Sequence, residues 1–139
     1  MAYLESRLLK LHQEILAYPN ESSLWITAPG INNSAGNLCY HILGNLNHYI
    51  GATIGQNGYV RNRPLEFTIR SVPIQDLEKG IFETIHMIKT TLESVEDLNA
   101  PYPKAAFNQE GTIAFFLMRV LLHIDYHLGQ INYHRRLLT

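Results

Sequence analysis

Apolar side chains recur three and four positions apart in four separate stretches of the chain, the spacing of a helix with one buried face. In the first stretch, from about residue 2 to 18, the repeating residues are Leu4, Leu8, Leu11 and Ile15. Pro19 ends this helix, because its ring cannot continue one. The segment 19–34 is expected to be a long loop, with a hairpin-like excursion around Leu24, Trp25 and Ile26.

A second helix is expected from about residue 33 or 34 to 55, opened by an asparagine or serine N-cap. Its apolar stripe consists of Leu38, Ile42, Leu46 and Ile50. The same segment holds four glycines: Gly36, Gly44, Gly51 and Gly55. Each glycine costs a helix about 1 kcal/mol relative to alanine. We therefore expect these glycines to let a neighbouring backbone or a ligand come close. Residues 56–67 are expected to be a loop.

Two further helices complete the pattern. The third is expected from residue 74 to 98, with a stripe of Leu77, Ile81, Ile85, Ile88 and Leu92, and the fourth from residue 112 to 138. Four helices without a comparable strand signal predict an all-α protein, a four-helix bundle in a single domain, residues 1–139. The first and last connections are long enough for a crossover, so up-down-up-down order is not forced.

The composition narrows the class of protein. The 11 lysines and arginines nearly balance the 12 aspartates and glutamates, without a run of like charge. Such a surface offers no binding site for nucleic acid or for an anionic membrane, and no stretch is apolar enough for a transmembrane helix. Cys39 is the sole cysteine, so no disulfide forms within the chain, and a cytoplasmic location is expected.

Histidine is the unusual residue, with seven copies in a short chain. His123 and His127 stand four positions apart in the fourth helix, so their imidazoles lie about 40° apart around the axis and one turn apart along it. This placement lets both rings bind one metal ion. Gln130 lies on the same face and is expected to orient a ligand ring through the N–H that faces away from the metal. The chain has no HExxH motif, which excludes a zinc peptidase of that type.

The second helix carries its own polar stripe, which includes His41, Asn45 and His48. Burying such groups without partners costs about 1–3 kcal/mol each, and facing the two stripes around a metal would satisfy many of them. We take His41 as the third ligand. His48 lies about 10 Å further along the helix and is an alternative ligand or a polar group at the pocket mouth. Asn45 is a second candidate for orienting a ligand N–H.

The remaining candidates are expected to have ordinary roles. His12, His86 and His134 are interpreted as surface or interface residues, and Cys39 as a small buried hydrophobe. Asp125 projects away from the histidine face and is expected in a salt bridge or behind a ligand. A metal-free alternative treats the histidines as a hydrogen-bond network in the core.

Three segments, NSAGNLCYHILGNLNHYI, RNRPLEF and HIDYHLGQINYHRRLL, together resemble the DinB/YfiT-like superfamily of metal-binding bundles over essentially the whole chain. The most specific part, HxxxHxGQ at residues 123–130, is similar to the family's closing helix, and His41 matches the remaining ligand. RNRPLEF resembles a motif of one branch, in which the matching residues are Arg61, Arg63, Glu66 and Phe67. The resemblance implies an up-down-down-up bundle, a bound Zn²⁺ or Ni²⁺ and frequent homodimers.

The resemblance also implies a class of function. The family includes transferases that use bacillithiol or similar low-molecular-weight thiols, and a mycothiol-dependent isomerase. The expected function is therefore a metal-dependent transfer of such a thiol to an electrophile, with Arg61 and Arg63 binding the carboxylates of the thiol cofactor. The alternative is a non-catalytic, metal-containing protein of the stress response that acts as a binding or scaffold protein through a homodimer. In either case, metal affinity is expected to weaken as the pH falls through about 6.5.

Overall fold

The computed structural model describes residues 1–104 and 109–138, and within these residues the fold is all-helical apart from two isolated β-bridges. The α-helices are α1 (Ala2–Leu16), α2 (Ala35–Leu46), α3 (Arg63–Thr68), α4 (Ile74–Glu93) and α5 (Ile113–Leu138). A 3-10 turn spans Glu21–Trp25, and a π-helix, Asn47–Ala52, continues α2. The prediction of an all-α protein is confirmed for the described part of the chain.

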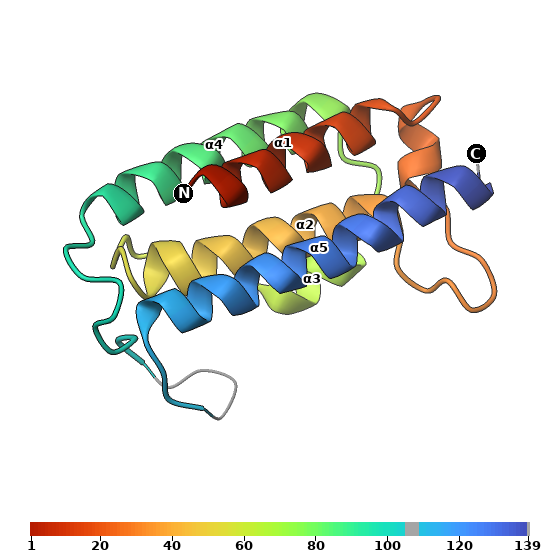
Figure 1. The fold of residues 1–139 in the computed structure, drawn as a ribbon. Helices are drawn as coiled ribbons and strands as arrows, with labels where there is room; N and C mark the ends of the chain where they lie inside the picture. The colour runs from red at the N-terminus through yellow and green to blue at the C-terminus, as the bar shows by residue number, and fades with distance from the viewer. Residues whose placement is uncertain (105–108, 139) are drawn as a thin grey trace.

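The four long helices share one apolar core. α1 packs against α4 and α5, and α2 packs against the same two helices. Figure 1 shows α1 beside α4 and α2 beside α5, with α1 and α5 running in one direction and α2 and α4 in the other. The core is filled by aliphatic side chains that are fully buried, among them Leu8, Leu11, Ile42, Ile81 and Ile124. Each such side chain contributes about 1.5–3 kcal/mol through burial.

The first connection contains more regular structure than a loop prediction allows. Asn20 accepts a hydrogen bond from the Ser23 amide (3.0 Å) and thereby caps the 3-10 turn. The hairpin-like excursion lies a few residues later than expected: the amides and carbonyls of Ala28 and Ile31 pair across a tight turn in which Gly30 has a φ of 80°. A positive φ suits glycine, which has no Cβ to clash.

One predicted helix end and one predicted loop were wrong. The helix expected to reach residue 98 ends at Glu93, because the Ser94 hydroxyl bonds the Thr91 carbonyl (2.7 Å) and the Asp97 side chain bonds the Asn99 amide (2.8 Å). Such side-chain to backbone bonds compete with helix continuation. In the segment expected to be a loop, α3 forms because Asn62 caps its start and Pro64 occupies the first turn, where no N–H is needed.

Close approach of other segments explains two glycines of the second helix. Ser34 caps this helix as expected, accepting from the Asn37 amide (3.2 Å). A Cβ on Gly36 would lie 2.6 Å from the indole ring of Trp25, and one on Gly44 would overlap the carboxylate of Glu66. Other segments do come close at these two glycines, but the approaching groups are side chains, not the backbone or ligand that was expected.

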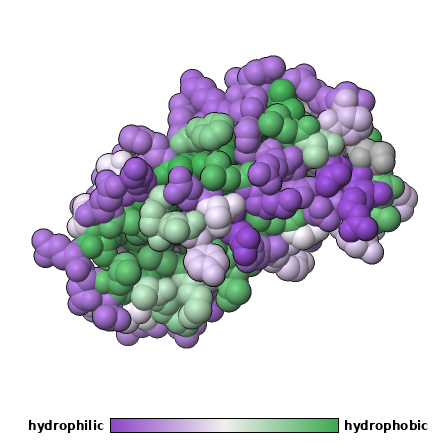
Figure 2. All heavy atoms as spheres, turned by 45° about the horizontal axis from the view of Figure 1, so that its top comes forward, coloured by the Kyte–Doolittle hydropathy of each residue, from purple (hydrophilic) through white to green (hydrophobic). Residues whose placement is uncertain are grey.

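The surface alternates between polar and apolar regions, and Figure 2 shows apolar patches set among hydrophilic side chains on one face. Within residues 1–104 and 109–138, no helix combines the length and the hydropathy that crossing a bilayer requires.

Candidate metal centre

The three predicted histidines meet where α2 lies against α5. His41 comes from α2, and His123 and His127 come from α5. One ring nitrogen from each lies within 4.8 Å of the others. His41 is buried, whereas the two histidines of α5 are half-buried. The prediction that the two helices bring these three imidazoles close enough to hold a metal ion is confirmed.

The local sequence explains why the three rings stand at the edge of the core. Each helix buries an isoleucine directly after its histidine: Ile42 follows His41, and Ile124 follows His123, and both isoleucines are fully buried. These residues fix the rotation of α2 and α5 about their axes. Because the histidine precedes the buried residue by about 100°, its ring lies where the two helices meet.

A buried carboxylate holds the ring of His41. Glu66 is 5% exposed, and its Oε2 lies 2.8 Å from His41 Nδ1. Arg61 donates to the same carboxylate from Nε (2.7 Å) and Nη2 (2.9 Å), the two-pronged geometry typical of arginine with a carboxylate. His41 therefore carries its proton on Nδ1 and donates it to Glu66, which leaves Nε2 free as a ligand atom. Carboxylates commonly orient metal-binding histidines in this way.

Hydrogen bonds from α2 to main-chain carbonyls in and just after α3 hold Glu66 beside His41. The Asn37 side-chain amide donates to the Glu66 carbonyl (3.0 Å) and to the Ile69 carbonyl (2.9 Å). Gly44 provides the space that the carboxylate occupies on the surface of α2. Sequence reasoning assigned no role to Glu66 beyond a motif match. The sequence feature that could have pointed to Glu66 is an acidic residue a few positions after Arg61 and Arg63, in a segment where Asn62 can cap a helix.

A side-chain amide holds the ring of His127. Nδ1 of His127 lies 2.7 Å from Gln130 Oε1, and Gln130 in turn donates to the Tyr126 hydroxyl (3.4 Å). With its proton on Nδ1, His127 keeps Nε2 unprotonated, and one nitrogen of its ring lies within 4.8 Å of the other two histidines. The structure thus places Gln130 where the predicted orienting role requires it.

His123 completes the group through a direct contact with His41. The Nε2 atoms of the two rings are 3.0 Å apart. Because Nε2 of His41 lacks a proton, Nε2 of His123 donates its own proton across this contact. A metal ion between the rings would take the place of that single proton. The three rings and their partners therefore fit a divalent ion, since each ring can offer a neutral nitrogen.

Burial keeps these histidines neutral. It lowers the pKa of His41, although the hydrogen bond to Glu66 opposes the effect, and it also lowers the pKa of His127. The pKa of His123 falls to about 4, because burial is reinforced by repulsion from His127 and His41 when they are charged. Imidazoles with lowered pKa values are ready to ligate at neutral pH without first losing a proton.

The lowered pKa values predict an unusual pH dependence of metal affinity. Protons compete with the metal only as the pH approaches the histidine pKa, so the affinity should hold from pH 8 down past the ordinary imidazole pKa of about 6.5 and be lost toward pH 4, near the pKa of His123. Isothermal titration with Zn²⁺ between pH 8 and 4.5 measures this. A progressive loss that already begins above pH 6.5 would show ordinary, exposed histidine ligands and would contradict the neutral buried cluster.

Two other predicted pocket residues stand apart from the three rings. His48 lies on the π-helix, half-buried against the ring of Tyr49 (4.8 Å between centroids), and does not belong to the histidine cluster. Asn45 is 5% exposed, and its Oδ1 has no hydrogen-bond partner in the described part of the chain. The orienting hydrogen bonds that Asn45 was expected to share come from Glu66 and Gln130.

The two arginines of the RNRPLEF segment occupy different positions. Arg61 is engaged by Glu66, with its side chain 12% exposed. Arg63 is exposed, and its guanidinium lies over the ring of Phe67 (5.4 Å), which itself packs against His41 (4.8 Å between centroids). Arg63 therefore stands at the rim of the site, where it could meet an anionic ligand.

Other predictions away from the site have mixed outcomes. His134 was expected at the surface or at an interface but is 3% exposed within the protomer, where its two ring nitrogens are satisfied by the Tyr18 hydroxyl (2.8 Å) and the Ile26 carbonyl (2.8 Å). Cys39 is fully buried as expected, and burial raises the pKa of its thiol to about 12. Asp125 forms the expected salt bridge, with Arg7 (2.7 Å).

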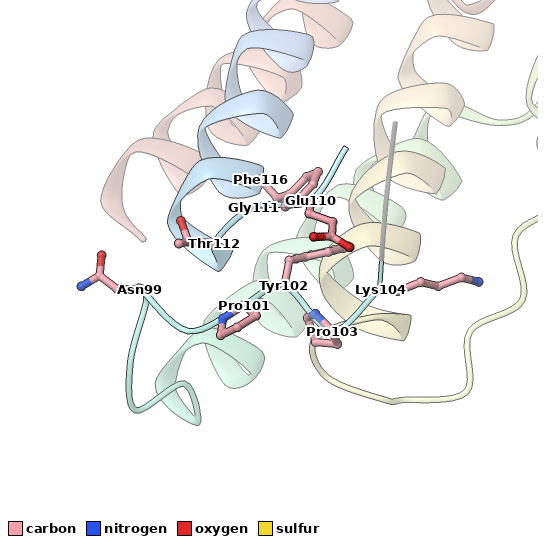
Figure 3. Close-up of a pocket in the computed structure, with 9 residues that line it drawn as sticks. All are labelled: Asn99, Pro101, Tyr102, Pro103, Lys104, Glu110, Gly111, Thr112 and Phe116. Atoms are coloured by element: carbon pink, nitrogen blue, oxygen red, sulfur yellow. The ribbon is translucent and has the colours of Figure 1, made fainter. Parts of the chain in front are cut away.

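A separate cavity of about 520 Å³ opens between the 99–104 loop and the start of α5 (Figure 3). The rings of Tyr102 and Phe116 lie in its wall, with their centroids 4.4 Å apart and their planes tilted by 36°. Lys104 extends away from the other side chains labelled in Figure 3. Among its described lining residues there is no histidine or cysteine, so the cavity is distinct from the histidine cluster.

Comparison with known proteins finds no match, whether against protein-family models, curated proteins or solved structures.

Proposed function

We propose that this chain is a divalent-metal protein of the DinB/YfiT-like type, with His41, His123 and His127 as ligands. The observation that carries the proposal is the hydrogen bonding behind the rings. Glu66 and Gln130 fix the protons of His41 and His127 on Nδ1, so that unprotonated nitrogens converge. Zn²⁺ and Ni²⁺ both suit three imidazoles.

The arrangement of the helices supports the family part of the proposal. An up-down-down-up bundle requires the first and last long helices to run in one direction and the middle two in the other, as the ribbon in Figure 1 does. α1 and α2 each contact both α4 and α5. We assign the chain to a single cytoplasmic domain of this kind.

We further propose that the site serves transfer of a low-molecular-weight thiol to an electrophile. A divalent ion held by three neutral imidazoles keeps a position for water or a thiol and lowers the pKa of a thiol bound there. His41, held by Glu66 and Arg61, and His127, held by Gln130, keep the ligand nitrogens in place. Arg63 at the rim would bind a carboxylate of the thiol cofactor.

Turnover of a model electrophile tests the catalytic proposal. Metal-loaded protein is expected to join a carboxylate-bearing thiol, bacillithiol or glutathione, to monochlorobimane: the sulfur–carbon bond forms, chloride leaves, and the thiol proton passes to solvent. Arg63→Gln should raise KM for these thiols about tenfold and leave KM for uncharged 2-mercaptoethanol unchanged. Equal effects on both thiols would refute the assigned role of Arg63.

A second candidate function is a metal-containing binding or scaffold protein without catalysis. Exposed apolar side chains along α5 favour a protein partner. A metal-loaded protein that is inactive with every thiol tried would support this candidate over the transferase.

A further inference from the structure

Asn45 is a buried residue of α2 whose side-chain oxygen has nothing to bond. The residue is 5% exposed, and its Oδ1 has no hydrogen-bond partner in the described part of the chain. Polar groups inside proteins are nearly always paired, because an unpaired acceptor has lost its hydrogen bonds to water and gained none in return. We therefore expect the partner of Asn45 to come from outside the chain.

The two other asparagines in the helical segment 35–52 do have partners. The Asn37 amide donates to two main-chain carbonyls in and just after α3, at 3.0 and 2.9 Å. The Asn47 amide donates to the Leu43 carbonyl and to the Thr84 hydroxyl, both at 2.9 Å. The fold thus satisfies the asparagines on either side of Asn45 along the chain, so the unpaired oxygen is particular to this position.

The helical register places Asn45 on the face of α2 that meets α5. Around the helix axis, Asn45 lies between His41 and Ile42, about 40° from the first and about 60° from the second. His41 touches His123 of α5, and Ile42 is fully buried in the core. Asn45 therefore faces the same neighbouring helix as His41, one turn and about 6 Å further along α2.

The antiparallel course of the two helices narrows the space between Asn45 and the histidines. α2 and α5 are in contact and run in opposite directions (Figure 1). Side chains on a helix tilt toward the N-terminus of that helix. The His123 side chain therefore tilts along α5 toward the level of Asn45, while the Asn45 side chain tilts along α2 toward the level of His41. The unpaired oxygen thus lies on the Asn45 side of the three rings, within about one helical turn.

An N–H close to the sulfur of a thiol has the reach to bridge this distance. When two carbons separate the nitrogen from the sulfur, the two atoms lie about 4 Å apart. An N–H···O hydrogen bond adds about 2.9 Å. The sum covers the turn of helix between His41 and Asn45. N-acylated cysteine and cysteamine both have this arrangement, whereas a simple alkyl thiol has no N–H to offer.

We propose that Asn45 determines which thiols the site accepts, by receiving at Oδ1 a hydrogen bond from an N–H two carbons away from the sulfur. The inference rests on the proposed function, since it requires an ion at the three histidines and a thiol bound to that ion. It differs from the role of Arg63, which concerns a charged carboxylate at the exposed rim. Asn45 instead recognises a neutral group in a buried position, where an unmatched ligand leaves the acceptor unpaired.

Two probe thiols that differ at a single position test the contact. N-acetylcysteamine carries the N–H, whereas 2-mercaptoethyl acetate has an ester oxygen in its place and the same length. Titration of Co²⁺-loaded protein with each thiol, followed by the sulfur-to-cobalt charge-transfer absorbance, measures affinity without turnover. Wild-type protein should bind N-acetylcysteamine about tenfold more tightly, the net effect of one hydrogen bond. Equal affinity for the two thiols, as expected if an internal water satisfies Asn45, would overturn the proposal.

Asn45→Ala and Asn47→Ala form a matched pair of variants for the same titration. Asn45→Ala should weaken binding of N-acetylcysteamine about tenfold, to the level of the ester, and change the affinity for the ester by less than about twofold. Asn47→Ala removes an amide that bonds within the protein, and it should keep the tenfold preference. A preference that persists in Asn45→Ala would show that another group accepts the N–H.

Thermal unfolding of the metal-free protein tests whether Asn45 has a structural role instead. Asn45→Ala leaves no acceptor unpaired and improves the helix propensity, so the melting temperature should not fall. Asn47→Ala loses hydrogen bonds to Leu43 and Thr84 and should melt a few degrees lower. A fall in Asn45→Ala as large as that in Asn47→Ala would mean that the amide is bonded within the protein, which contradicts the proposal.

The cobalt spectrum separates failure of this inference from failure of the proposed function. Absorbance recorded before any thiol is added reports whether Co²⁺ occupies the three histidines. Protein that takes up no Co²⁺ would refute the metal centre, and the role of Asn45 with it. Protein that takes up Co²⁺ and binds both thiols alike would refute the role of Asn45 alone.

Discussion

Replacing His127 by alanine is expected to abolish stoichiometric metal binding while leaving the fold intact. The variant removes one of the three ring nitrogens that converge within the described part of the chain. Loss of a hydrogen-bond partner behind a ligand typically costs 10–100-fold in metal affinity, and loss of the ligand itself should cost more. Elemental analysis of protein purified without a histidine tag measures the metal content, and circular dichroism measures the helix content.

The fold should survive because His127 stands at the edge of the core. Its neighbours on α5, Ile124 and Ile131, are fully buried and hold the helix without it. Alanine also favours a helix more than histidine does. The expected change in the free energy of unfolding of the metal-free protein is therefore within about 1 kcal/mol.

Two other histidines serve as controls for the ligand assignment. His86→Ala alters an exposed residue of α4, and His48→Ala alters the alternative ligand on the π-helix. Both variants should keep full occupancy. Full occupancy in His127→Ala would refute the site, and loss of metal in His48→Ala would show that His48 is a ligand.

The long amphipathic helices could be predicted because the spacing of their apolar residues marks the face that is buried. Leu4, Leu8, Leu11 and Ile15 follow the helical spacing, and all four are buried. The helix ends were less predictable. Residues 94–99 carry apolar positions in helical register, but the chain there turns through local hydrogen bonds of Ser94 and Asp97 that compete with the helix.

The candidate site could be predicted as far as its three histidines and Gln130, and no further. His123 and His127 share a helix face by spacing alone, and His41 follows from a second polar stripe. Glu66 could not be placed, since α3 has only six residues and too short a pattern to reveal a buried face. Its position depends on contacts distant in sequence, the hydrogen bonds from Asn37 and the space above Gly44. His134 was misplaced for a similar reason, because its partners Tyr18 and Ile26 come from the other end of the chain.

Gly44→Ala is expected to disrupt the candidate metal centre by displacing Glu66, without altering any of the three histidines. The new Cβ would overlap the carboxylate of Glu66, so the carboxylate has to leave the surface of α2. His41 then loses the acceptor that fixes its tautomer, and Arg61 loses its partner. Metal affinity should fall by about 10–100-fold, the range observed when such a partner is removed. Stability should fall by about 1–3 kcal/mol through overpacking, partly offset by the better helix propensity of alanine.

A double-mutant cycle with Glu66 distinguishes displacement of the carboxylate from a general defect in α2. Once Glu66→Ala has removed the carboxylate, Gly44→Ala has nothing left to displace, and its additional effect on metal affinity should be less than about threefold. Gly80→Ala in α4 is the matched glycine control, since its Cβ would meet only the flexible end of Leu43 at 3.1 Å, and it should leave the affinity unchanged. If Gly44→Ala weakened metal binding equally with and without Glu66, the carboxylate would not be what holds His41 in place. Dependence of the effect on Glu66 would instead show that a glycine in α2 and a glutamate in α3 act together to hold a histidine ligand.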